Sequence, residues 1–251
     1  MKQKVGGAWY ARGGSRVHEL YTIMHLPYTS MVLSYTLIGA MFSPAIYLDR
    51  IVLTVLAYFL GLGLSAHALN ELHAAHWTEA LGKSELTVVF VLPLIGALAI
   101  GAYGTLELWT VSRSTLPPIL LVILILIETF FLFAYNVDAF GGRLHGDVSF
   151  AFSWAALPTL ISYFVNALTI TAAALFVALA MAATASIEIN LSRWCKELRR
   201  RSALSELQFA DGTHQRMNTL ELVAGPEKAL KLIVIVVDMI AISLITYRLL
   251  L

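Results

Sequence analysis

Histidine and carboxylate side chains gather near residue 70, at the end of an apolar stretch of the chain. The group comprises His67, Glu71, His73 and His76, and His145 could join it from further along the sequence. Imidazole and carboxylate ligands suit zinc or iron, so these residue types make a transition-metal site one hypothesis. The spacing argues against it, because a straight helix cannot turn His67, Glu71 and His76 toward a single ion. A histidine and carboxylate metal site is therefore a minor alternative.

Polar clusters also end two other apolar stretches. One runs from Asn136 to Asp147, and the other runs from Glu188 to Glu197. In the topology derived below, both clusters lie on the same side of a membrane as all seven histidines. We therefore expect one side of the membrane to carry the functional site.

The apolar stretches that position these clusters are long enough to cross a membrane. Of the 251 residues, 59% are hydrophobic and only 13% are charged, whereas soluble domains carry about 25% charged residues. Most of the stretches approach the roughly 20 residues that a bilayer crossing needs. The expected spans are Leu26–Leu48, Ile51–Asn70, Leu86–Leu106, Leu116–Val137, two within Val148–Ile187, and Leu232–Tyr247. The predicted fold is an all-α, polytopic transmembrane helical bundle of about seven spans.

The stretch Val148–Ile187 is divided because its 40 uncharged residues would form a helix of about 60 Å, twice the bilayer core. Asn166 marks the expected turn, since Asn favours leaving a helix. The chain then reads as one membrane domain, 1–251. It comprises an arm (1–24), spans one to six (25–187), a loop (188–228) and span seven (229–251).

The distribution of Lys and Arg gives the orientation. All but three of the 17 Lys and Arg residues fall on the side of the N-terminus, and the exceptions are Arg50, Arg113 and Arg248. Cytoplasmic loops carry the excess of Lys and Arg, so the expected location is the cell membrane, with the N-terminus inside and the C-terminus outside. The net charge of +1 gives no reason to expect a nucleic-acid partner.

The polar residues at the span ends form a pattern. It consists of Asn70-Glu71, Lys83, Tyr135, Asn190-Leu-Ser-Arg193, and the segment 219–228 that leads into the last span. This pattern resembles the UbiA superfamily of intramembrane prenyltransferases, over roughly residues 20 to 240. In that family two Asp-rich motifs face each other at the inner mouth of a helical bundle. They hold Mg²⁺ ions that bind an isoprenyl diphosphate, and the isoprenyl group passes to an aromatic or lipid acceptor.

The resemblance implies a role for each matching residue. Asn70, Glu71, Asn190 and Glu197 are the expected catalytic residues, and Glu71 and Glu197 are the expected Mg²⁺ ligands. Lys83 and Arg193 are expected to bind the diphosphate. His67 and Tyr135 are expected to line the pocket.

Helical geometry supports part of this assignment. Asn190, Arg193 and Glu197 share one face of a helix, so Glu197 is the carboxylate placed to replace a lost Asp, whereas Glu188 is expected to point away. An ion pair between Arg193 and Glu197 is the simpler alternative for these two residues.

The main functional hypothesis is a divergent prenyltransferase, with membrane lipids, an isoprenyl diphosphate and a hydrophobic acceptor as partners. The alternative is a non-catalytic UbiA-like subunit that binds a lipid, a quinone or a partner complex. That alternative is motivated by Ala74, Trp194 and Leu198, which occupy Asp positions of the family motifs, and by seven spans where the family usually has nine.

Two carboxylates lie in the middle of spans, Glu128 in the fourth and Asp238 in the seventh. Such residues are costly in a membrane and commonly mark function, although hydrogen bonds to neighbouring spans can make them structural. The sequence leaves both interpretations open.

Overall fold

The protein is an all-α bundle, which confirms the predicted fold class. The computed structural model describes residues 8–11, 15–74, 80–201 and 204–250. Its helices are α1 (Arg16–Ile23), α2 (Leu26–Met41), α3 (Leu48–Tyr58), α4 (His67–Ala74), α5 (Lys83–Val111), α6 (Leu116–Asn136), α7 (Asp147–Ala151), α8 (Leu157–Ala167), α9 (Ala172–Arg200) and α10 (Thr219–Leu250), with π-helical segments η1 (Phe59–Ala66) and η2 (Phe152–Ala156). Two short strands, β1 (Ser205–Gln208) and β2 (His214–Met217), complete the described chain.

Six helical segments of the described residues are long and apolar enough to cross a membrane. They are Leu48–Ala74, Lys83–Val111, Leu116–Asn136, Asp147–Ala167, Ala172–Arg200 and Thr219–Leu250. The remaining apolar stretch, which is the first in the sequence, forms α2. Its 16 residues span about 24 Å, somewhat less than the roughly 30 Å hydrocarbon core. These segments identify the chain as an integral membrane protein.

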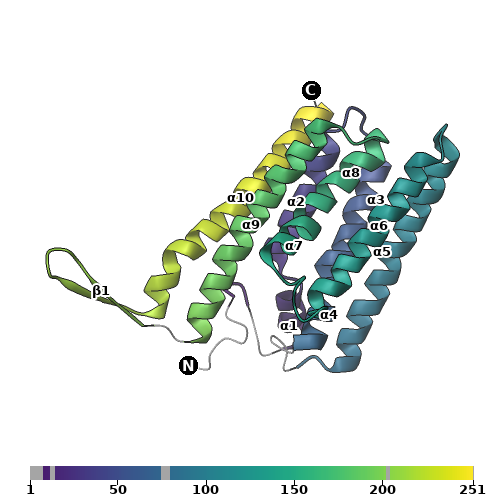
Figure 1. Cartoon of the computed structure of the whole chain (residues 1–251). Helices are drawn as coiled ribbons and strands as arrows, with labels where there is room; N and C mark the ends of the chain where they lie inside the picture. The colour runs from purple at the N-terminus through teal and green to yellow at the C-terminus, as the bar shows by residue number, and fades with distance from the viewer. Residues whose placement is uncertain (1–7, 12–14, 75–79, 202–203, 251) are drawn as a thin grey trace.

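The short helix α2 lies inside the bundle, packed between α8 and α10 (Figure 1). Met31, Tyr35 and Ile38 are almost fully buried there. Its crossing with α8 is tight at Gly39, where an added Cβ would lie 2.1 Å from the backbone oxygen of Thr159. A glycine is required at this point because the neighbouring atom is backbone and cannot rotate away.

The uncharged stretch divides close to the predicted turn. α8 ends at Ala167, and Leu168 adopts a left-handed conformation with φ of 56° before α9 begins at Ala172. Asn166 lies in the last turn of α8, where its side chain donates to Ser162 and accepts from the Tyr47 amide. Asn166 therefore secures the helix end rather than forming the turn itself.

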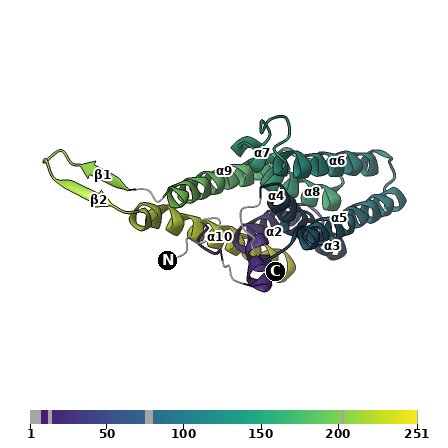
Figure 2. The ribbon, with the colours of Figure 1, turned by 90° about the horizontal axis from the view of Figure 1, so that it is seen from below.

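The expected loop 188–228 is mostly helical. α9 continues to Arg200, because Lys, Glu, Leu and Arg between 196 and 200 are strong helix formers. α10 begins at Thr219, ten residues before the expected span. Between the two helices, β1 and β2 form an antiparallel hairpin that projects from the bundle (Figure 2).

The hairpin, α1 and α4 lie at the same end of the bundle. We call this end the hairpin end. The C-terminal end of α10 lies at the opposite end (Figure 1). α4, the start of α5, the ends of α6 and α9, and the start of α7 all meet at the hairpin end (Figure 1). The polar clusters found in the sequence therefore lie at one end of the bundle.

Candidate functional site

A cavity of about 690 Å³ opens at the hairpin end. It is bordered by α4, the end of α6, η2 and α9, together with the residues where α2 begins. Tyr28, Tyr135, Phe150 and Trp154 give it an aromatic wall, and the rings of Phe150 and Trp154 stack with centroids 5.3 Å apart. The wall formed by α9 is charged.

The charged wall follows from the spacing of residues on α9. Glu188, Ser192 and Lys196 are four residues apart and therefore share a face of the helix. All three line the cavity, as do Arg193 and Arg200. The hydroxyl of Tyr28 donates to Ser192 at 3.2 Å, which fixes this face against α2. Three cationic side chains thus border one cavity at the membrane boundary, where a low dielectric strengthens their attraction for an anion.

Within the part of the chain that the structure describes, two buried polar atoms of the cavity wall have no hydrogen-bond partner. They are Oε1 of Glu188 and Nε2 of His67. The His67 ring is held between the ring of His25, 4.3 Å away between centroids, and that of Trp154, 5.0 Å away. Buried polar atoms are nearly always hydrogen-bonded, so these two indicate that a ligand or ordered water completes the cavity.

Two π-helical segments position residues that line this cavity. η1 ends at Ala66, immediately before His67, and η2 contains Trp154. π-helical turns are rare and occur mostly at functional sites. In η1 the chain also needs Gly63, where an added Cβ would lie 2.8 Å from Cγ2 of Thr29.

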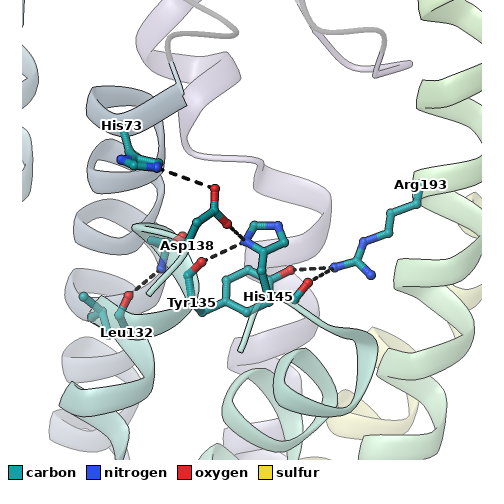
Figure 3. Close-up of polar contacts among 7 residues, drawn as sticks. His73, Leu132, Tyr135, Asp138, His145 and Arg193 are labelled. Carbon is teal, nitrogen blue, oxygen red and sulfur yellow. Dashed lines mark hydrogen bonds and ion pairs between the residues drawn. The ribbon is translucent and has the colours of Figure 1, made fainter. Parts of the chain in front are cut away.

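Arg193 ties α9 to the loop between α6 and α7. Its guanidinium donates to the hydroxyl of Tyr135 at 3.2 Å and to the carbonyl of His145 at 2.9 Å (Figure 3). It also pairs with the carboxylate of Asp147, the first residue of α7. Arg193 therefore stabilises the structure in addition to lining the cavity. The sequence predicted a diphosphate contact or, alternatively, an ion pair with Glu197, but Glu197 pairs with Arg201 instead.

His145 extends this network toward α4. Its ring stacks on Tyr135 with centroids 4.3 Å apart. Its Nδ1 lies 2.8 Å from the Tyr135 carbonyl oxygen and 2.8 Å from Oδ1 of Asp138, and the other Asp138 oxygen lies 3.5 Å from Nε2 of His73 (Figure 3). The network links α4, α6 and α9 across the mouth of the cavity.

The structure brings most of the predicted site residues together. The cavity is lined by His67, Asn70, Tyr135, Asn190, Arg193 and Glu197. Lys83 is not among its lining residues, because it is the exposed first residue of α5. Glu71 is buried but does not line the cavity either.

The sequence missed two central residues, and one expectation was wrong. Glu188 was expected to point away from the site, yet it is 3% exposed and lines the cavity. The predicted face of this helix was centred on Asn190 and Arg193. The residues of α9 that line the cavity cover a wider part of the helix surface than that face. The signal that could have found Lys196 is its spacing of eight residues from Glu188, which places both on one face.

The donor set does not fit the Mg²⁺ site that the UbiA resemblance implies. Glu71 lies outside the cavity lining, and Glu197 pairs with Arg201 at 2.6 Å. Glu188 lines the cavity together with Asp138 and Glu197, but Asp138 pairs with His73 and His145, and among the described residues no three acidic or imidazole groups gather at one point. A divalent cation prefers several oxygen ligands gathered at one point, and these three glutamates do not provide them.

The histidine-based metal site also lacks a donor set among the described residues. No group of three or more His, Cys, Asp or Glu in that part of the chain could hold a metal ion. His67 lines the cavity, whereas His73 is not among its lining residues and pairs with Asp138. His76, the remaining residue of this hypothesis, lies outside the described residues.

His25 supports the cavity from the segment between α1 and α2. It is buried, hydrogen-bonded to the Tyr10 hydroxyl and in ring contact with His67. Burial holds the pKa of His25 well below its ordinary value, and the nearby His67 and Lys196 lower that pKa further. His25 is therefore a neutral member of the cavity wall at physiological pH.

Searches against family models, curated proteins and solved structures found no match for this chain. The fold and the cavity define a class, an integral membrane helical bundle with a polar cavity at one end. The UbiA resemblance rests on the residues quoted above.

Proposed function

We propose that this protein binds an isoprenyl diphosphate in the hairpin-end cavity, as a divergent relative of the UbiA-type prenyltransferases. The observation that carries the proposal is the charged wall of α9, where Arg193, Lys196 and Arg200 line one cavity at the membrane boundary. Lys and Arg form charge-assisted hydrogen bonds to phosphate oxygens. The apolar and aromatic residues opposite them suit an isoprenoid tail.

The two cavity cations other than Arg193 are the proposed headgroup ligands. Arg193 holds the Asp147 and Tyr135 contacts and is a positioning residue. Lys196 and Arg200 lie one and two turns beyond Ser192 toward the hairpin, where a diphosphate would enter from the aqueous side. We assign no step to a divalent cation, because the glutamates present do not fit one.

Prenyl transfer is the second candidate. It is favoured by the aromatic wall, because Tyr135, Phe150 and Trp154 border the same cavity as the cations. Aromatic faces attract cations, and an allylic cation forms when a prenyl diphosphate ionises. The geometry supports binding more directly than transfer, since the carboxylates expected to hold Mg²⁺ are not gathered.

For the orientation, we propose that the hairpin end faces the cytoplasm. The excess of Lys and Arg falls on this end of the bundle, which the positive-inside rule associates with the cytoplasmic side. A cysteine introduced at exposed Ser84 would then resist an impermeant thiol reagent in intact cells. Labelling of that cysteine from outside would overturn this part of the proposal.

The binding proposal is tested with farnesyl diphosphate and the purified full-length protein. Substituting Lys196→Met should weaken binding about tenfold to a hundredfold, the cost of losing a charged hydrogen bond of about 1.5–3 kcal/mol. Lys231→Met is the matched control, because Lys231 lies 4.9 Å over the Trp9 ring and outside the cavity. Failure of farnesyl diphosphate to bind, or equal losses in both variants, would contradict the proposal.

A further inference from the structure

A second cavity lies within the membrane-spanning part of the bundle. It has a volume of about 120 Å³ and lies between α3, η1, α5 and α6, with α8 behind it. We call it the lateral groove. Apart from Thr54 and Thr129, its polar lining residues are Arg50, Tyr58, Glu107 and Glu128, and the remainder is apolar.

Small residues keep the lateral groove open. Ala57, Gly61, Ala97, Gly101 and Gly104 all line it. At Gly101 an added Cβ would lie 2.9 Å from the Ile125 side chain, so a larger residue there would press on the opposite wall. The groove therefore exists because several positions lack bulk, in a region where leucine and isoleucine are otherwise abundant.

Glu128 faces this groove with one oxygen unused. Its Oε2 lies 3.5 Å from the hydroxyl of Tyr58, which is a long contact. Its Oε1 is buried and has no hydrogen-bond partner in the described parts of the chain. A carboxyl in the middle of a membrane is expensive, and an unsatisfied oxygen adds to that cost.

The charged residues of the groove, Arg50 and Glu107, already pair with each other. Arg50 pairs with Glu107 at 2.8 Å and donates to the carbonyl of Val165 at 2.8 Å. An anionic headgroup would have to break this pair. Glu128 lies twelve residues into α6, about 18 Å from the helix start and thus near the bilayer centre, where a charged ligand is disfavoured.

We propose that the lateral groove binds a neutral apolar alcohol or phenol, whose hydroxyl group donates a hydrogen bond to Oε1 of Glu128. The small-residue walls accept the part of the hydrocarbon next to the hydroxyl, because a cavity of about 120 Å³ holds a group of about the size of benzene, and the rest of a longer chain extends out of the groove. Tyr58 holds the other carboxyl oxygen. The ligand differs in charge from the anion proposed for the hairpin-end cavity. The inference does not depend on the proposed function, because the two cavities have different lining residues.

The experiment uses a farnesol analogue that carries a photoactivatable diazirine and an alkyne, with the purified full-length protein in lipid nanodiscs. Crosslinked peptides should come from α3, α5 and α6. Unlabelled farnesol should compete for crosslinking, whereas the hydrocarbon farnesene, which lacks the hydroxyl, should compete about three- to tenfold less well. Equal competition by farnesene, or labelling spread evenly over the lipid-exposed helices, would overturn the proposal.

Two variants separate the hydrogen bond from the groove itself. Glu128→Leu should reduce crosslinking about three- to tenfold, while Glu128→Gln, which keeps an acceptor oxygen, should retain most of it. Ala97→Phe should abolish crosslinking by filling the groove. Each variant is first checked for a monodisperse, folded state. A folded Glu128→Leu protein that crosslinks as well as the unmodified chain would contradict the assignment.

Discussion

The contact between α2 and α10, which we call the seam, differs from the hairpin-end cavity in how it pairs a carboxylate within the bundle. At the seam, Asp238 accepts hydrogen bonds from Ser30 at 3.0 Å and from Ser34 at 2.7 Å. In the cavity, Glu188 is more deeply buried than the half-buried Asp238, yet its Oε1 has no hydrogen-bond partner among the described residues. The satisfied carboxylate joins two helices, whereas the unsatisfied one borders a cavity that a ligand can complete.

This difference gives a way to interpret carboxylates that the sequence could not classify. Asp238 and Glu128 both lie in the middle of spans, and the sequence left a structural and a functional interpretation open for each. Asp238 has two serine donors and acts as a polar contact between helices. Glu128 resembles Glu188 instead, because it leaves one oxygen unpartnered beside a cavity.

The largest expected effect is on the free energy of unfolding when the seam is changed. Asp238→Leu removes the acceptor of Ser34 and one of the two acceptors of Ser30, which also donates to the Pro27 carbonyl, and should lower the free energy of unfolding by about 2–4 kcal/mol. Asp238→Asn keeps an acceptor oxygen and should cost less than half as much. Unfolding in mixed detergent micelles measures both. Neither variant should change farnesyl diphosphate affinity, and a large loss of affinity in folded Asp238→Asn would show that the seam is functional.

The next effect concerns pH and His25. An unfolded His has a pKa near 6.5, and burial holds the folded pKa well below this, so the unfolded state binds the proton first as the pH falls. His25 should therefore cost about 1.4 kcal/mol of stability at pH 5.5 relative to pH 8.

His25→Asn removes this titration and suits the left-handed backbone of residue 25, whose φ is 45°. The difference in unfolding free energy between pH 8 and pH 5.5 should be smaller in this variant than in the unmodified protein. An identical pH dependence in the two proteins would show that His25 is accessible to protons in the folded state.

The smallest effect tests the unpartnered carboxylate of the cavity. Glu188→Gln prevents ionisation beside the proposed anion and should strengthen farnesyl diphosphate binding about three- to tenfold when measured near pH 9, while changing the unfolding free energy by about 1 kcal/mol or less. Equilibrium binding and unfolding measured on the same preparation check both. Weaker binding in Glu188→Gln would indicate that this carboxylate donates or coordinates rather than repels.

The sequence predicted the helices well because a membrane imposes a simple rule on length and composition. Each predicted span is a helix, and the division near Asn166 lies within a few residues of the observed one. The predicted helix boundaries were wrong outside the apolar stretches, because α9 continues to Arg200 and α10 begins at Thr219. Apolar length says nothing about helices that continue past the membrane, where helix propensity and capping decide.

The site was predicted only in part, for a geometric reason. Asn70, Tyr135, Asn190 and Arg193 were expected near one another, and all four line the cavity. The pairing of Arg193 with Asp147 joins residues far apart in the sequence, so no spacing rule contains it. The π-helical turns before His67 and around Trp154 are also invisible to a pattern of 3.6 residues per turn.

The most direct test of the account is the affinity of farnesyl diphosphate for the purified protein, measured with EDTA and then with Mg²⁺. Lys196 and Arg200 are the proposed headgroup ligands, and the described residues gather no carboxylate set for a divalent cation. We therefore expect binding in EDTA, changed by no more than about twofold on adding Mg²⁺, and weakened by high salt because charged contacts are screened. Binding that disappears in EDTA and returns with Mg²⁺ would contradict the account and restore a magnesium site.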